Sequence, residues 1–89
     1  MTTAQNAADW MLQALNRDGC IYQDDVVDYL VKASANDLLR ENADGNLVIG
    51  KSVLAAFLKL TETTVVWVKP DRYWRWRVKE DEPGRDARG

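Results

Sequence analysis

The sequence predicts a small α+β protein in which three helices pack on a small antiparallel sheet with a C-terminal β-hairpin. Three observations indicate this class. Apolar residues recur at helical spacing in three separate segments. Two runs of β-branched and aromatic residues flank Pro70-Asp71 near the C-terminus. The chain has 89 residues, 46% of them apolar, which suits a single domain with a modest core. We expect this domain to span residues 1–79 and residues 80–89 to form a polar, flexible tail.

The first helix is predicted over residues 4–17, where Thr3 can cap the start and Gly19 can end it. Trp10 lies off the centre of the apolar side, so we expect it to be only partly covered and available to a partner. The residues that recur at helical spacing are Ala8, Met11, Leu12 and Leu15.

A short strand is predicted at residues 20–22, followed by a second helix that runs to about residue 33. Gln23 or Asp24 is expected to cap this helix, and the carboxylates of Asp24 and Asp25 suit the positive end of its dipole. Its predicted apolar side consists of Val26, Val27, Leu30 and Ala33.

Residues 36–49 have two interpretations. Leu38 and Leu39 fit either a helical turn or one arm of a hairpin, while Asp44-Gly45 predicts a turn and residues 47–49 a buried strand. A third helix is predicted over residues 51–60. Its expected inward residues are Val53, Leu54, Phe57 and Leu60, and its outward residues are Lys51, Ser52, Ala55 and Lys59.

The stretch VVWVKPDRYWRWR, residues 65–77, is expected to form the C-terminal hairpin. Because side chains alternate along a strand, its second arm has two faces. We expect Trp74, Trp76 and Val78 on one face, with the tryptophans covering the core, and Tyr73, Arg75 and Arg77 on the other.

The place of Trp67 depends on the length of the hairpin loop. A two-residue loop, Pro70-Asp71, pairs Trp67 with Trp74 on one face. A three-residue loop that adds Arg72 sets Trp67 opposite Arg75, where an exposed stack of ring and guanidinium is plausible. The sequence leaves both registers open.

The predicted order of helix, strand, helix, irregular or hairpin segment, helix and hairpin is that of a winged helix. The ordered motifs WMLQAL, CIYQDD, DGNLVI, VLAAFLKL, VVW, YWRWR and DEPGR also resemble a family of small uncharacterised bacterial proteins with a winged-helix-like fold, from residue 8 to about residue 85. More loosely, the chain resembles small stand-alone proteins carried on mobile gene cassettes. The resemblance implies a fold and no activity. Residues 34–50 depart from the ~3–4-residue turn of a helix-turn-helix, which leaves the placement of the third helix open.

The sequence lacks the usual signatures of catalysis and metal binding. It contains no histidine, its two serines have no nearby base, and its glycines form no phosphate-binding loop. A calcium loop at residues 40–51 fails because Arg40 and Lys51 occupy its first and last ligand positions. We therefore expect no enzyme, no cofactor, no metal and no small-molecule substrate. The single cysteine, Cys20, is expected to be a buried, inert thiol. Together with the lack of a signal peptide or membrane span, it favours a cytoplasmic protein.

Charge is distributed unevenly along the chain. Residues 1–50 carry three basic and eight acidic side chains, whereas residues 51–79 carry seven basic and two acidic ones. The second half can therefore present a basic face to nucleic acid, although such a face also fits a solvated sheet edge or a protein contact. The candidate residues of this face are Lys51, Ser52, Lys59, Lys69, Arg72, Arg75 and Arg77.

The leading functional hypothesis is a non-catalytic winged-helix-like module that binds nucleic acid through the residue 51–60 helix and the basic 65–78 hairpin. The third helix offers no outward Arg, Asn or Gln for reading bases, so we expect mostly sequence-independent affinity. The alternative is a protein-interaction or homodimerisation domain that uses Trp10, Trp67 and the hairpin edge.

Overall fold

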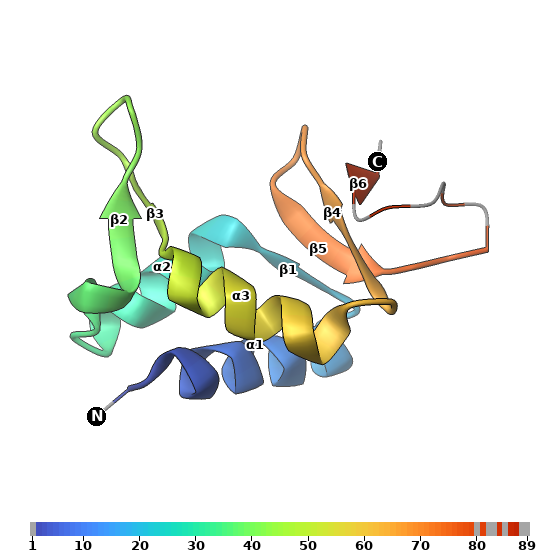
Figure 1. Cartoon of the computed structure of the whole chain (residues 1–89), viewed down its shortest axis with the longest axis horizontal. Helices are drawn as coiled ribbons and strands as arrows, with labels where there is room; N and C mark the ends of the chain where they lie inside the picture. Colours follow the sequence, from blue (N-terminus) through green and yellow to red (C-terminus); the bar gives the residue numbers. More distant parts are fainter. Residues whose placement is uncertain (1, 80, 82–83, 85, 88–89) are drawn as a thin grey trace.

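The computed structural model describes residues 2–79, 81, 84 and 86–87, and within them the predicted α+β class, the three helices and the C-terminal hairpin are confirmed. In Figure 1 the two hairpins project from the same side of α3, and α1 lies along the other side of that helix. The elements are α1 (Ala4–Asp18), β1 (Cys20–Tyr22), α2 (Gln23–Lys32), a 3-10 turn η1 (Asn36–Leu38), β2 (Leu39–Glu41), β3 (Leu47–Ile49), α3 (Lys51–Thr61), β4 (Val65–Val68), β5 (Tyr73–Trp76) and β6 (Asp86–Ala87).

Helix α1 begins and ends as its sequence predicts. The Thr3 hydroxyl accepts a bond from the Asn6 N–H at 3.1 Å, and the Asn6 side chain accepts one in return from the Thr3 N–H at 3.2 Å. Gly19 ends the helix with φ of 80°, a left-handed conformation that favours glycine.

The predicted cap of α2 is wrong. Tyr22 occupies the N-cap position without a side-chain capping bond, and Gln23 is already the first helical residue. The helix follows β1 directly, and the Gln23 N–H donates to the Arg72 carbonyl at 2.9 Å. The chain therefore passes from sheet to helix with no free residue to serve as a cap. Asp24 and Asp25 lie in the first turn, as expected, whereas Ala33 is exposed beyond the helix end.

Residues 36–49 combine both predicted alternatives, a helical turn in η1 and a hairpin of β2 and β3. The turn between the strands is closed by Asn42, whose Oδ1 accepts N–H bonds from Asp44 at 2.9 Å and Asn46 at 3.0 Å. Gly45 has a φ of 80°. The segment therefore contains the turn that Asp44-Gly45 predicted. The predicted burial of residues 47–49 is wrong in part, because Ile49 is buried and Leu47 is 47% exposed.

Helix α3 buries Val53 and Phe57 and exposes Lys51, Ser52, Ala55 and Lys59, as predicted. Leu60 was expected inward, but it is 38% exposed. Thr61 is buried instead because it continues the four-residue spacing of Val53 and Phe57. Its hydroxyl donates to the Phe57 carbonyl at 2.7 Å, so no polar atom of this side chain is left unsatisfied.

The main sheet has the strand order β1-β5-β4-β6, with β1, β5 and β4 antiparallel and β6 parallel to β4. Trp67 pairs with Trp74, so the two-residue loop is correct and the three-residue register is wrong. The turn is closed by the Arg72 N–H, which donates to the Lys69 carbonyl at 3.3 Å. Arg72 itself adopts a left-handed φ of 54°. The exposed stack of Trp67 against a guanidinium is therefore excluded.

The core lies between the helices and one face of the main sheet. Trp74 is buried there, and its ring meets Phe57 edge-on with centroids 5.5 Å apart. Trp76 is partly buried against the same core. Val78 was expected on this face, but it lies beyond the end of β5 and is 49% exposed.

The predicted flexible tail, residues 80–89, falls partly on residues outside the described part of the chain. Of those described, Asp81 bonds to Arg75, and Asp86–Ala87 form β6. Within the described residues, no helix has both the length and the apolar character required to cross a membrane.

Candidate nucleic-acid interface

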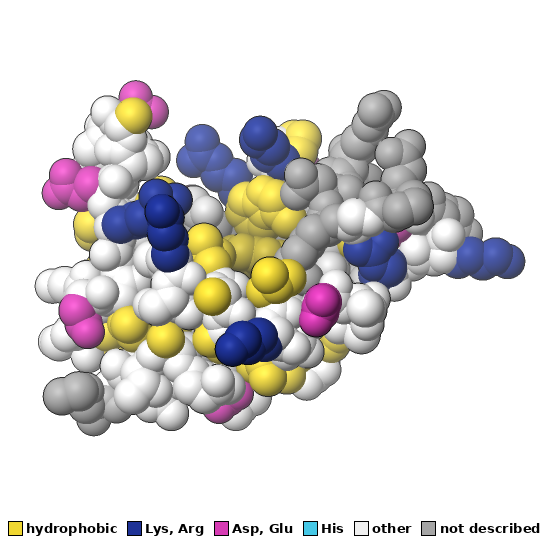
Figure 2. All heavy atoms as spheres, viewed as in Figure 1, with side chains coloured by type: hydrophobic (Ala, Val, Ile, Leu, Met, Phe, Trp, Pro, Cys, Tyr) yellow, Lys and Arg dark blue, Asp and Glu magenta, His cyan; other side chains and the backbone are white. Residues whose placement is uncertain are grey.

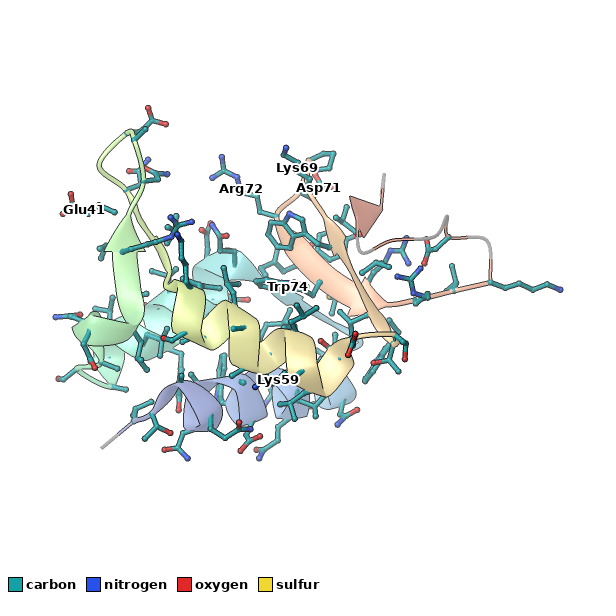
Figure 3. The ribbon with its side chains drawn as sticks, in the orientation of Figure 1. Glu41, Lys59, Lys69, Asp71, Arg72 and Trp74 are labelled. Carbon is teal, nitrogen blue, oxygen red and sulfur yellow. The ribbon has the colours of Figure 1, made fainter. Side chains whose placement is uncertain are left out.

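Exposed basic side chains of the second half lie on α3, on the hairpin turn at residues 69–72, and at Lys79 beyond β5. Lys51 and Lys59 are exposed on α3, and Lys69 and Arg72 are exposed on the turn. None of these four cations forms an ion pair with another described residue. Figure 3 places Lys69 and Arg72 at the tip of the projecting hairpin and Lys59 on α3, where that helix borders α1. We call these four residues the basic face. Ser52 is exposed beside Lys51.

Arg75 is occupied by contacts within the chain. Its guanidinium donates to both carboxylate oxygens of Asp81, at 2.8 and 3.0 Å, and to the Trp76 carbonyl at 3.1 Å. The bond from Arg75, followed by one from the Val78 N–H, lowers the pKa of Asp81 to about 2. The same pairing raises the pKa of Arg75. Arg75 therefore holds the segment after β5 in place. Its bonded guanidinium is less available to an external phosphate.

Arg77 also makes internal contacts. Its backbone N–H donates to the Thr64 carbonyl at 2.8 Å, and its guanidinium donates to the Gly84 carbonyl. The sequence groups Arg75 and Arg77 with Lys69 in one basic face, but both arginines bond to other described residues, whereas no ion pair joins Lys69 to one.

Trp67 is partly buried against Trp74, with ring centroids 4.5 Å apart and planes tilted by 47°. Figure 2 shows apolar side chains gathered between the two hairpins, above α3. On α3 itself, Leu54 is partly buried and Leu58 is 42% exposed. The interface is therefore apolar as well as basic, which the inward-outward pattern of α3 did not predict.

Acidic side chains interrupt the basic face. Asp71 lies in the hairpin turn, between Lys69 and Arg72, and Glu41 is exposed on the other hairpin. Figure 3 shows Glu41 on the side of the β2–β3 hairpin that faces away from Arg72. A polyanion that follows α3 would therefore meet attraction at one hairpin and repulsion at the other.

Trp10, the other predicted interface aromatic, stacks flat on Tyr29, with ring centroids 4.0 Å apart and planes within 6°. This contact joins α1 to α2, and Trp10 is partly buried by it. The sequence pointed to Trp10 but not to Tyr29, because no helical or strand spacing connects residues so far apart in the chain.

The match to a known family covers nearly all of these features. A model described as Family of unknown function (DUF6953) matches residues 3–76. The chain belongs to this family. No curated protein and no solved structure matches it.

The DUF6953 match confirms the expectation of an uncharacterised family; the bacterial origin and the winged-helix resemblance stay predictions. The matched span runs from the cap of α1 to the end of β5. It includes all four residues of the basic face and Arg75, and it ends before Arg77 and Asp81. Among the described residues, no group of three or more Cys, Asp or Glu side chains is placed to hold a metal ion.

Proposed function

We propose that the chain is a non-catalytic, winged-helix-like module that binds nucleic acid through α3 and the turn of the β4–β5 hairpin. The observation that carries the proposal is the basic face. Its four cations come from α3 and from the turn of the hairpin that follows α3 in the chain, and they lack ion pairs with described residues, as the exposed Arg40 and Lys79 also do. By contrast, Arg17, Lys32 and Arg75 each contact a carboxylate. The proposal keeps the bacterial, cytoplasmic setting predicted from the sequence.

Binding of this kind would depend mainly on phosphate contacts. Lysine and arginine side chains that neutralise phosphates release counterions, and the logarithm of the binding constant falls by about 0.9 per contact for each logarithmic unit of salt. Four contacts therefore predict a slope of about −3 to −4. The outward side of α3 offers Ser52 but no Arg, Asn or Gln, so we expect little discrimination between duplex sequences.

The internal contacts of Arg75 and Arg77 remove these two residues from the interface that the sequence predicted. A guanidinium that already bonds a carboxylate must lose those bonds to reach a phosphate. We therefore assign Arg75 and Arg77 to the shape of the hairpin and its following segment, and the phosphate contacts to Lys51, Lys59, Lys69 and Arg72.

Fluorescence anisotropy with a mixed-sequence DNA duplex, at low and at physiological salt, tests the proposal. We expect Lys69→Ala with Arg72→Ala to weaken binding and to reduce the salt slope by about 2, one for each contact removed. The matched control is Arg17→Ala with Lys32→Ala, which removes the same charge from cations on α1 and α2. No binding at low salt, or equal losses in both double variants, would overturn the proposal.

A protein-binding function is the second candidate, favoured by the exposed apolar side chains of α3. Leu58 is 42% exposed and Leu60 38% exposed, and neither belongs to the core. Light scattering on a size-exclusion column would show a concentration-dependent mass if these residues mediate self-association. Leu58→Asp should then return the chain to a monomer, whereas a monomer at all concentrations removes self-association.

A further inference from the structure

The surface between the two hairpins carries apolar side chains that the core does not fully cover. On α3, Leu58 is 42% exposed and Leu54 is half-buried, and the two leucines share one side of the helix because they are one turn apart. On the sheet, Trp67 packs on Trp74 and stays partly exposed. Figure 2 shows the apolar side chains gathered above α3, between the hairpins. We call Leu54, Leu58 and Trp67 the apolar patch.

Cations of the basic face lie at both ends of the apolar patch. Lys51 is one turn before Leu54, on the same side of α3. Lys69 follows Trp67 by two residues, and it lies with Arg72 at the tip of the β4–β5 hairpin (Figure 3). The hairpin turn carries Asp71 as well, but its two cations leave it a net positive charge. A ligand that covers the patch therefore meets positive charge on α3 and at the hairpin, which favours an anion.

This combination of surfaces suits a single nucleic-acid strand better than a duplex. In a duplex the bases pair and stack inside, so the outer surface consists of phosphates, sugars and groove edges. Apolar side chains pressed against that surface would remove water from it without replacing the lost hydrogen bonds. In a single strand, the bases can turn toward the protein and bury apolar area while the phosphates reach the cations. Charge alone predicts the opposite preference, because a duplex has the higher charge density.

We propose that the apolar patch binds single-stranded DNA, with bases against the patch and phosphates at the cations on either end. This inference rests on the nucleic-acid function proposed above and specifies its ligand. DNA is favoured over RNA because leucine and tryptophan side chains offer no hydrogen-bond acceptor for a ribose 2′-hydroxyl. The sequence did not indicate the patch, since Leu54 was expected inward, Leu58 was assigned to neither side of α3, and the register of Trp67 was open.

Fluorescence anisotropy with one labelled mixed-sequence oligonucleotide, alone and annealed to its complement, compares the two forms directly. At physiological salt, the strand should bind about 5-fold more tightly than the duplex, the scale of one base packed on the protein. Its three phosphate contacts should give a salt slope of about −2, against about −3 to −4 for the duplex. An RNA strand of the same sequence should bind more weakly than the DNA strand.

The outcomes separate this inference from the proposed function. Duplex binding that equals or exceeds strand binding would overturn the inference and leave the nucleic-acid function standing. RNA binding that equals or exceeds DNA binding would overturn the assignment to DNA. No binding of any form at low salt would overturn both the inference and the proposed function.

Two leucines of α3 provide a matched pair of variants. Leu58 is 42% exposed and Leu60 38% exposed, and a separation of two residues turns them to opposite sides of the helix. Leu58→Gln should weaken strand binding about 2- to 5-fold, because less apolar area is buried against the bases, and should leave duplex binding unchanged. Leu60→Gln should change neither. Equal losses in the two variants would overturn the assignment to the patch, and circular dichroism reports whether each variant is folded.

Two-dimensional NMR locates the bound strand. Adding the strand should shift the Trp67 indole N–H and the backbone amide of Leu58. Trp10 and Cys20 provide reference signals because they line a separate pocket between α1, β1 and α2. Cys20 is partly exposed there, whereas the sequence predicted burial. Shifts at Trp10 and Cys20 without a shift at Trp67 would place the strand elsewhere and overturn the proposal.

Discussion

Trp74 sits where the sheet meets α3, and its surroundings predict a large effect of its removal. The side chain is 5% exposed, with its ring edge-on to Phe57 and 4.5 Å from Trp67. Trp74→Ala should lower the free energy of unfolding by about 3–5 kcal/mol, because a cavity remains where the indole packed. Urea denaturation measures the loss. Trp76→Ala, at a partly buried site, should cost less, and an equal cost would contradict the central place of Trp74.

Gly50 is required by a close backbone approach. Its N–H donates to the Leu38 carbonyl at 2.8 Å, and a Cβ added there would lie 2.5 Å from the same oxygen. Gly50→Ala should therefore displace the η1–β2 segment and destabilise the fold by about 1–3 kcal/mol, as overpacking does. Thermal and urea unfolding would measure this change. Ser52→Ala, exposed two residues later, should stay within about 0.5 kcal/mol, and a neutral Gly50→Ala would contradict the contact.

For single residues, the sequence predicted burial correctly where the repeat of a strand or helix alone determines which side chains face the core. Strand alternation assigned Trp74 to the core correctly. It could not place Trp67, because that residue depends on the loop length rather than on the strand pattern. The loop length is fixed by the left-handed backbone of Arg72, a conformation that glycine or asparagine would have indicated and arginine does not.

Among the elements, the segment after β5 depends on the ion pair between Arg75 and Asp81. The pKa of Asp81 is lowered to about 2 from an ordinary value of 3.8. The folded state therefore stabilises the ionised carboxylate relative to the unfolded state. This stabilisation is present above about pH 4 and is lost as the pH falls through about 2. Asp81→Asn should therefore destabilise the protein at neutral pH, and its difference from the parent should shrink in acid.

Urea midpoints of the parent and Asp81→Asn, compared between pH 7 and pH 2, would measure this dependence. The test is sharpest in an Arg75→Met background, where Asp81 has lost its guanidinium partner. There the pH dependence of the Asp81→Asn effect should be smaller. An unchanged dependence in that background would show that Arg75 is not its main cause.

The hairpin turn allows stability to be separated from binding. Arg72 holds a left-handed φ of 54°, which costs a residue with a Cβ about 1–2 kcal/mol and glycine almost nothing. Arg72→Gly should leave the free energy of unfolding unchanged or raise it by up to about 1 kcal/mol. The same change should weaken duplex binding and reduce the salt slope by about 1. Urea denaturation measures the first effect and anisotropy the second. A lower stability of Arg72→Gly would show that the left-handed backbone of Arg72 is not strained.

Helix positions could be predicted from periodicity, whereas contacts between elements could not. The three helices agree with the sequence to within one or two residues, since their apolar spacing repeats over several turns. The Arg75–Asp81 pair crosses a turn that the Asp81 carboxylate itself closes by accepting the Val78 N–H at 2.8 Å. Neither periodicity nor a turn dipeptide signals such a contact.

For the whole molecule, the sequence predicted the separation of charge but not how it is displayed in space. The basic second half supplies α3 and the β4–β5 hairpin, as expected. The β2–β3 hairpin, from the acidic first half, projects beside them (Figure 1). This position follows from packing of β3 against α2 and from the approach of Gly50 to Leu38, both of which arise only in the folded chain.

The arrangement of the two hairpins yields a prediction about the path of a bound duplex. Glu41 is exposed on β2, on the hairpin opposite the one that carries Arg72, and forms no ion pair with a described residue. If DNA follows α3 between the hairpins, Glu41→Gln removes a repulsion and should tighten binding about 1.5- to 5-fold at low salt, the scale of one exposed charge interaction. Asp24→Asn changes the net charge equally on α2 and should have a smaller effect. Anisotropy titrations of both variants measure the difference, and equal affinities would place the DNA at the β4–β5 hairpin alone.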